Sequence, residues 1–243
     1  MYQSGLESLS LLDTGRDTAW HWVADAERVP YWDQASPIRQ LLFWWLQTRG
    51  YLQVHAGAVG TPEGGVLLVG KSGSGKSTVS LCCLGSSLQF AGDDYVAVST
   101  GQAPQVASLY GSAKLEPEHV TRLLPHLVPL LANRGRLDSE KALLYVNRHF
   151  PSQVTSGFPL RAVVVPTVRP AQRESRLVPI SRSAAFAALA PSTIVQLHTA
   201  RQDALAAMAA LLALVPCYGL EFGSDLAAVP DALVSLLERL SSS

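Results

Sequence analysis

The sequence predicts an α/β fold in which a mixed central sheet is flanked by helices. From residue 51 onward the hydrophobic patterns follow the order strand, strand, helix, strand, and mixed elements come after them. In addition, 48% of the 243 residues are apolar and only 16% are charged, which excludes a largely disordered protein. We expect one globular unit over 50–243, with residues 1–49 as a strand and helix extension packed on it.

The extension is predicted to contain an edge strand and a helix. Aromatic and polar residues alternate over 18–25, as in a strand with two different faces. Ser36 followed by Pro37 is typical of a helix start, because serine caps free backbone N–H groups and proline fits the first turn. The helix then covers 38–47 with a nearly continuous apolar surface and ends at Gly50.

The next segment predicts the centre of the sheet. Two strands cover 51–59 and 65–69, and the turn residues between them include proline and glycine. A helix follows over 76–84. The apolar run over 88–100 predicts another strand, which is broken at Gly92.

The second half of the chain predicts further strands and helices in alternation. A helical pattern over 117–132 is interrupted by Pro125 and Pro129, so we expect a kinked or split helix there. Short apolar runs of the buried-strand kind and longer helical patterns make up the rest: strands over 143–146, 162–165 and 218–222, and helices over 181–189, 194–214 and 232–240.

Charge and composition exclude two classes of partner. Lysine plus arginine and aspartate plus glutamate each total 19, so the chain has no net charge to attract nucleic acid or acidic lipid. The longest apolar stretch, 204–218, is too short to cross a hydrocarbon core of about 30 Å, so we expect no membrane span. Three cysteines cannot form a disulfide framework, which predicts a reduced, cytoplasmic chain.

The segment Gly70-Lys71-Ser72-Gly73-Ser74-Gly75-Lys76-Ser77 fits the pattern G-x-x-x-x-G-K-[ST] of phosphate-binding loops. Its glycines permit positive φ and leave backbone N–H groups open to phosphate oxygens. Lys76 can reach the outer phosphates of a nucleoside triphosphate, and the Ser77 hydroxyl can bind Mg²⁺. The predicted nucleotide-binding residues are Gly70, Ser72, Gly73, Ser74, Gly75, Lys76, Ser77 and Thr78.

Two adjacent carboxylates follow at a short interval. Asp93 lies seventeen residues after Lys76, which leaves room for one helix and one return strand to the glycine-rich loop. Phosphoryl transfer needs a carboxylate for Mg²⁺ and a group that orients or deprotonates the acceptor hydroxyl. Because neighbouring side chains of a regular strand point to opposite faces, Asp93 and Asp94 can serve together only if Gly92 lets the chain bend. The alternative interpretation is that Asp93 and Asp94 begin a turn and are exposed to solvent.

His55 is a further candidate, one strand upstream of the loop. It precedes the small residues Ala56 and Gly57, which leave space for a ligand or for another part of the backbone. A single histidine in a strand is more often structural than catalytic. From the residues alone, both interpretations stay open.

The ordered set of His55-Ala-Gly-Ala-Val, Gly70 to Ser77 and Gly92-Asp93-Asp94 resembles the HPr kinase/phosphorylase-like branch of P-loop proteins. The fold of that branch is similar to that of phosphoenolpyruvate carboxykinase. The resemblance covers residues 50–100 and extends more weakly to 161–166, 181–189 and 216–223. It is closest to the stand-alone HPr kinase-like proteins of peptide-modification pathways, including those that make lasso peptides.

The resemblance implies a role for each matching residue. Lys76 would contact the β- and γ-phosphates of ATP, and Ser77 would hold Mg²⁺ together with Asp94. Asp93 would be the base that takes the proton of the acceptor hydroxyl, although the roles of the two aspartates could be exchanged. His55 would lie near the transferred phosphate. The implied substrate is a serine hydroxyl of a peptide or protein, and because HPr kinases form multimers, a homo-oligomer is one expectation.

The sequence departs from the family in two respects. Residues 1–49 do not resemble its usual amino-terminal domain, and the nearest match to the basic loop of the reverse, phosphorolytic reaction is Arg169. Lys114 and Lys141 are further cations that could approach the transferred charge. These departures favour kinase over phosphorylase activity.

Two rival functions are compatible with the residues. A small-molecule kinase would need a lid rich in arginine, for which five residues are available: Arg134, Arg136, Arg169, Arg173 and Arg176. A non-catalytic nucleotide-binding module that regulates a peptide-processing complex is the other. A pure binder has no chemical need for Lys76, Ser77, Asp93 and Asp94 together, which argues against it.

Overall fold

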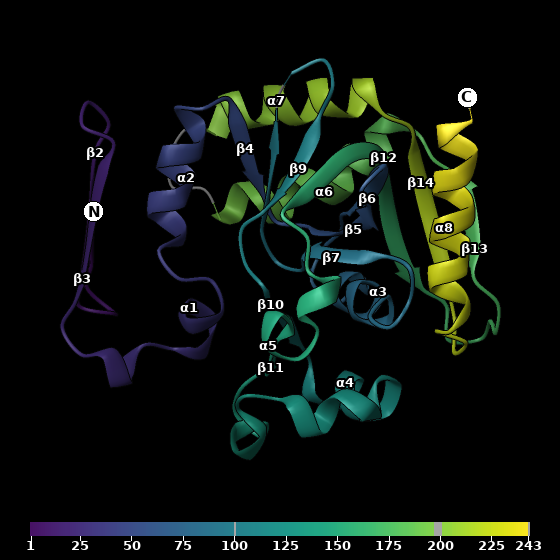
Figure 1. Cartoon of the computed structure of the whole chain (residues 1–243), viewed down its shortest axis with the longest axis horizontal. Coiled ribbons are helices and arrows are strands. Elements are labelled where there is room, and N and C mark those ends of the chain that lie inside the picture. The colour runs from purple at the N-terminus through teal and green to yellow at the C-terminus, as the bar shows by residue number, and fades with distance from the viewer. Residues whose placement is uncertain (100, 197–200, 243) are drawn as a thin grey trace.

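The computed structural model describes residues 1–99, 101–196 and 201–242. Figure 1 shows a central sheet with helices on both faces and a thin amino-terminal layer at one side. This arrangement confirms the predicted α/β class with a mixed central sheet. In the described residues, no helix is both long enough and apolar enough to span a membrane.

The strands are short except for β12. Their bounds are β1 Tyr2–Gln3, β2 Ser8–Asp13, β3 Thr18–Val23, β4 Tyr51–Val54, β5 Gly57–Thr61, β6 Gly64–Leu68, β7 Gln89–Gly92, β8 Val96–Ser99, β9 Gln105–Ser108, β10 Ser112–Leu115, β11 Ala142–Tyr145, β12 Gly157–Val168, β13 Arg176–Pro179 and β14 Cys217–Phe222.

The helices include eight α-helices and several short 3-10 turns in the described part of the chain. The α-helices are α1 Tyr31–Ala35, α2 Arg39–Gln47, α3 Lys76–Cys82, α4 Pro117–Leu123, α5 Val146–His149, α6 Arg182–Gln196, α7 Arg201–Leu214 and α8 Ala228–Ser241. A 3-10 segment, Pro125–Leu130, continues α4 after the break at Leu124. The predicted split at Pro125 is therefore confirmed.

Strand β12 joins the two parts of the main sheet, whose order is β4-β8-β9-β12-β6-β5-β7. Its first residues pair with β9 in an antiparallel manner. Its later residues pair in parallel with β6 on one side and β14 on the other, and β13 pairs with β14. One long strand thus holds the antiparallel part of the sheet beside the part that leads into the glycine-rich loop.

Alternate residues of the central strands supply two different cores. Leu67 and Val163 pack toward α6 and α7, where Leu189 and Met208 are fully buried. Their neighbours, such as Val66, pack on the opposite face against α3 and α8. Because both faces are covered, these strands are apolar throughout rather than alternating.

A third core holds the small β10–β11 pair and α4 against α3. Its members are apolar side chains of these elements, of β7, of the start of α5, and of the 3-10 segment Pro125–Leu130 with the residue on each side of it: Leu81, Phe90, Ala113, Leu115, Val120, Leu124, Leu127, Leu131, Ala142, Leu144 and Val146. This packing brings a second layer of chain in front of the amino-terminal end of α3. It supplies the outer wall of the site described below.

Two predicted boundaries in the first half of the chain are wrong. Ser36 does not cap a helix start, because it ends the short helix α1, and Ile38 turns the chain with φ 51° before α2 begins. The single strand predicted over 51–59 is two strands. β4 pairs with β8 and β5 pairs with β6 and β7, so the chain changes its place in the sheet at residues 55–56.

The boundary between the last long helices is also misplaced by the sequence pattern. Helix α6 continues through Pro191 to Gln196, so Ile194 belongs to α6 rather than to the next helix. Proline removes one backbone hydrogen bond there, but the buried face of α6 compensates for it. Residues 197–200 of the predicted helix 194–214, and residue 100 of the predicted strand 88–100, lie outside the described residues.

Candidate functional site

The glycine-rich loop, residues 70–77, connects the end of β6 to the start of α3. Gly73 and Gly75 have φ of 78° and 103°, a region that favours glycine. A side chain at Gly75 would also meet the ring of Phe222 at 2.5 Å. Local sterics therefore require glycine at this position, and the first N–H groups of α3 have no side-chain cap.

Lys76 lies inside the curve of this loop. Its Nζ donates to the carbonyl oxygens of Gly70 at 2.7 Å and Lys71 at 3.3 Å. The side chain is buried, and burial lowers the pKa of Lys76 although Asp93 and Asp94 act in the opposite direction. An ammonium group held only by carbonyl oxygens and nearby carboxylates can exchange those partners for an anion.

The two aspartates lie in a bend between β7 and β8, and both approach Lys114 of β10. The Lys114 backbone N–H donates to Asp93 Oδ2 at 3.1 Å, and the Lys114 Nζ lies 2.9 Å from Asp94 Oδ2. The strand ends at Gly92, where a Cβ would meet Val96 at 2.6 Å. The bend allows both carboxylates to lie on the same side of the chain, as their joint use requires.

The environments of the two carboxyl groups differ. Burial, and next the charge of Asp94, raise the pKa of Asp93 to about 7, while the Lys114 N–H, the Ser77 hydroxyl and Lys76 lower it. Burial also acts to raise the pKa of Asp94, but His55 and Lys114 outweigh it and lower this pKa below its usual range. Asp93 thus holds its proton toward neutral pH, whereas Asp94 is a carboxylate.

His55 occupies the crossing from β4 to β5. Its Nε2 lies 3.7 Å from Asp94 Oδ1, and its ring packs against Tyr95 with centroids 5.4 Å apart. The backbone N–H of His55 donates to Thr193 of α6. The space beside it is used by another part of the backbone, since a Cβ on Gly57 would lie 3.3 Å from the Asp93 carbonyl oxygen.

A cavity of about 310 Å³ lies in front of the loop. Among the predicted site residues, its lining includes His55, Ser72, Gly73, Gly75, Lys76, Ser77, Thr78 and Asp94. Asp93 is 1% exposed and is not part of this lining. Gly70 and Ser74 line a second, more open cavity on the other side of the loop.

Sequence reasoning missed the outer wall of the cavity. His119 and Arg122 of α4 and Tyr31 of α1 line it together with Gln196 of α6. The spacing of His119 and Arg122 places both on one face of a helix, which is the one signal that could have identified them. Tyr31 and Gln196 come from distant segments and carry no sequence signal.

The three cations singled out from the sequence have different surroundings. Lys114 and Lys141 both line the cavity, and Lys141 Nζ lies 2.6 Å from Glu116 Oε1. Arg169 is not part of this lining and forms an ion pair with Glu221 at 2.8 Å. The other four arginines considered for a lid are absent from the lining as well.

Oxygen ligands for Mg²⁺ are available at this site. Asp93 Oδ1 is buried without a hydrogen-bond partner in the described residues, and the Ser77 hydroxyl and Asp94 are near it. The described part of the chain holds no cluster of three or more metal-binding His, Cys, Asp or Glu side chains. Mg²⁺ uses only one or two carboxylates and otherwise binds water and phosphate oxygens, so these residues fit it.

Comparison with known proteins shows similarity to solved structures, one of which is described below. No protein-family model matches the sequence, and no curated protein matches it. The structure is similar to that of the HPr(Ser) kinase/phosphatase from Coxiella burnetii, with a TM-score of 0.43 and 12% identity. The match covers 79% of this chain and 99% of that one.

The raised pKa of Asp93 predicts a pH dependence of stability. Between the pKa of about 4 in the unfolded chain and about 7 in the fold, the folded state binds more protons, so stability falls as pH rises. Asp93→Asn removes this loss. We therefore expect the Tm of the variant minus the Tm of the natural protein to increase between about pH 5 and about pH 8. The increase should exceed the 2–4 °C that about 1 kcal/mol produces.

Thermal unfolding followed by circular dichroism, in the presence of a chelator, measures this difference. Asp138→Asn is the matched control, because it makes the same substitution at an exposed aspartate. Parallel pH profiles of Asp93→Asn and the natural protein would contradict the assignment.

Proposed function

We propose that this protein is an ATP- and Mg²⁺-dependent kinase that transfers the γ-phosphoryl group to a hydroxyl, with a serine of a peptide or protein as acceptor. One observation carries the proposal: Lys76, Ser77, Asp93 and Asp94 meet at one place beside a cavity. Loop, cation and carboxylates are the parts that phosphoryl transfer requires. The fold similarity is compatible with this function.

The glycine-rich loop is the proposed phosphate site. Its open backbone N–H groups and the uncapped start of α3 offer donors to phosphate oxygens. In the proposed complex, Lys76 exchanges the carbonyls of Gly70 and Lys71 for oxygens of the β- and γ-phosphates. The lowered pKa of Lys76 is then reversed, because a phosphate neighbour stabilises the charged ammonium.

The geometry favours the exchanged roles for the two aspartates. A base must reach the acceptor hydroxyl, and Asp94 lines the cavity whereas Asp93 lies behind it. We therefore assign the base to Asp94, with His55 and Lys114 holding its carboxylate in place. Asp93, which interacts with Ser77, is the proposed metal ligand. Mg²⁺ at this position would neutralise charge on the transferred phosphoryl group.

The acceptor class rests on the sequence resemblance. A peptide serine, as in the pathways that make lasso peptides, is the substrate we propose. A small-molecule kinase loses its main support, because none of the five lid arginines lines the cavity. A homo-oligomer is a separate prediction from the resemblance.

Lys76→Ala should abolish phosphoryl transfer. Loss of the phosphate-binding ammonium removes stabilisation of transition-state charge, so we expect a decrease in rate of about a hundredfold or more. Transfer of label from γ-labelled ATP to serine-containing peptides, with the added phosphate verified by mass, measures this rate. Lys71→Ala is the matched control, since Lys71 is an exposed lysine of the same loop and should retain transfer.

Asp94→Asn and Asp93→Asn should separate the two roles. We expect Asp94→Asn to bind Mg²⁺-ATP normally and to lose transfer, because only the base is removed. Asp93→Asn should weaken nucleotide binding in Mg²⁺ but not in its absence. Calorimetric titration with ATP, with and without Mg²⁺, distinguishes these outcomes, and the reverse pattern would restore Asp93 as the base.

A further inference from the structure

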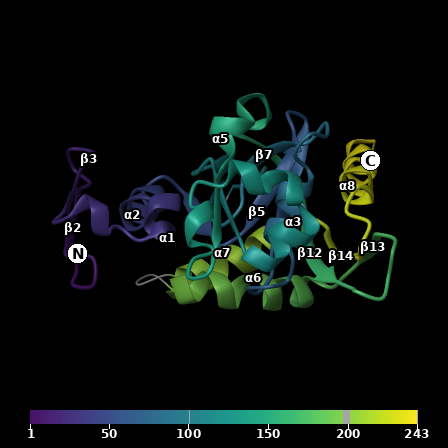
Figure 2. The same ribbon diagram turned by 90° about the horizontal axis from the view of Figure 1, so that it is seen from below.

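The amino-terminal strands form a small sheet of their own at the edge of the molecule. β1, β2 and β3 pair in sequence order, with Leu9 opposite Trp22 and Leu11 opposite Trp20. In Figure 2 this sheet is a thin layer beyond α1 and α2, with one face turned to the helices and the other turned away from the molecule.

The outward face of this sheet is apolar and uncovered. It carries Leu9, Leu11, Trp20 and Trp22, which are between 37% and 58% exposed, and Tyr2 beside them. Such a contiguous patch is unusual for a surface without a partner. The core does not need these side chains, so another molecule is the expected cover.

β3 also offers an open edge. In the described residues it pairs with β2 alone. Ala24 N–H donates to Glu7 O, and because hydrogen-bonded pairs alternate along antiparallel strands, the backbone groups of Trp20 and Trp22 point to β2. Those of Ala19 and His21 therefore point outward. The strand carries neither lysine nor proline, the residues that usually protect such edges.

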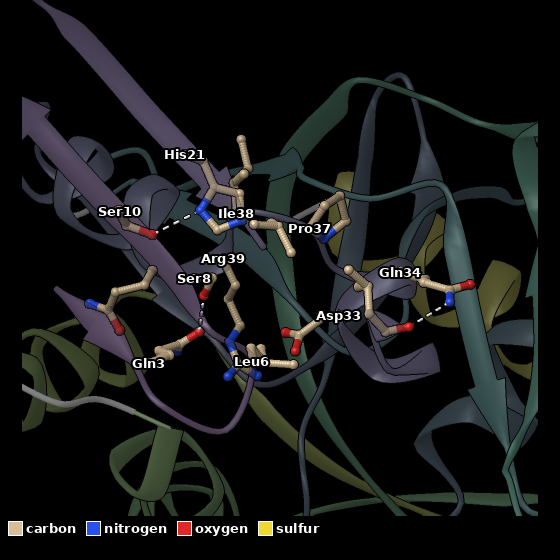
Figure 3. A pocket seen from close by; sticks show the side chains of 13 residues that line it. Gln3, Leu6, Ser8, Ser10, His21, Asp33, Gln34, Pro37, Ile38 and Arg39 are labelled. Carbon is tan, nitrogen blue, oxygen red and sulfur yellow. Dashed lines mark hydrogen bonds between the residues drawn. The ribbon is translucent and has the colours of Figure 1, made fainter. Parts of the chain in front are cut away.

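The inward face of the sheet borders a cavity of about 210 Å³. Figure 3 shows Ser10 and His21 of the strands on one side, with Asp33 and Arg39 of the helices facing them. Asp33 forms no ion pair in the described part of the chain. The cavity therefore has room beside a carboxylate that forms no ion pair, although the charge of Arg39 acts on it.

Arg39 connects this cavity to the candidate site. Its Nη1 donates to the Tyr95 hydroxyl at 2.6 Å, and Tyr95 follows Asp94 in the chain and packs against His55. A narrow hollow between them is lined by Arg39 as well as by His55 and Tyr95. Tyr31, eight residues after the end of β3, lines the site cavity itself. The extension thus leads from an open strand to the proposed phosphate-transfer site.

Acidic side chains are in excess in the first part of the extension. Residues 1–35 hold six acidic and two basic side chains, and the whole extension, residues 1–49, holds six and four. Asp25 and Glu27 follow β3 directly and form no ion pair within the described residues. Two copies of this sheet would repel each other, and an anionic lipid surface would repel the sheet as well. The charge instead favours a basic partner.

We propose that β3 is the docking strand for the acceptor, an extended peptide in which apolar and basic side chains alternate. This proposal rests on the proposed kinase function for the identity of the acceptor. The peptide adds a fourth strand through the outward backbone groups of β3. Its apolar side chains lie beside Trp20 and Trp22, and its basic side chains lie on the inward face near Asp33.

A synthetic peptide of about eight residues, with alternating valine and lysine and a terminal serine, is the probe. Fluorescence anisotropy of the labelled peptide, without ATP, measures docking independently of catalysis. We expect binding to the natural protein and at least about tenfold weaker binding when glutamate replaces lysine in the probe. Equal binding of the two probes, or none of either, would overturn the proposal.

Ala19→Pro tests the edge itself. Proline removes an N–H that no strand in the described residues uses, so the fold should persist while docking weakens by about tenfold. Ala19→Val keeps that N–H and is the matched control. Trp22→Thr, which suits a strand but removes an outward ring, should weaken docking as well and serves if the proline variant does not fold.

The outcomes separate docking from catalysis. In transfer assays with the same probe, Ala19→Pro should raise KM and leave kcat unchanged. Binding without any transfer would support docking and contradict the kinase function, whereas transfer with an unchanged KM would do the reverse. If sedimentation shows a dimer that Ala19→Pro dissociates, the occupant is a second copy of the chain and the proposal is wrong.

Discussion

The arrangement of the site depends on a cluster of four ionisable side chains that are buried or half-buried. Lys76 and Lys114 face Asp93 and Asp94, and the charged form of each would be more costly to enclose without the others. The position of this cluster requires particular placements of the strands around it. The strand before the bend must lie beside β5, and β10 must bring both its backbone N–H and its ammonium group to the carboxylates. The pairing of β10 with β11 holds Lys114 in this position.

The two neighbouring aspartates have different partners within this cluster, and this difference gives them different chemistry. Asp94 has the ammonium group of Lys114 and the imidazole of His55 close to it, so it stays ionised. Asp93 has a backbone N–H and lies in a more enclosed place, so its charge is opposed by burial and by its neighbour. When two carboxyl groups are pushed apart in this way, each can take a separate part in a reaction. The difference arises from their surroundings, because the side chains are identical.

Local patterns predicted the parts of the site that lie close together in sequence. The glycine-rich loop, the helix after it and the break at Gly92 each depend on residues within one turn or one strand. The partnership with Lys114 could not be predicted, because it requires β10 to pair with β11 across about thirty residues. Strand β2 was missed although Ser8 and Ser10 alternate with Leu9 and Leu11, since the exposed side of that alternation is the apolar one. The usual expectation of apolar residues inside is reversed there.

The net charge of zero conceals a difference in charge between parts of the chain. A total of zero argues correctly against a long-range field over the whole chain, yet the acidic excess of the extension is balanced by a basic excess elsewhere. Recognition acts over about 10 Å or less at physiological salt, so local excess rather than the total decides which partner approaches a given face. Arg39 of the extension contacts Tyr95 beside Asp94, so the extension borders the candidate site there. A cationic segment drawn to the extension would therefore be held at the border of the candidate site, opposite the proposed phosphate position beside Lys76.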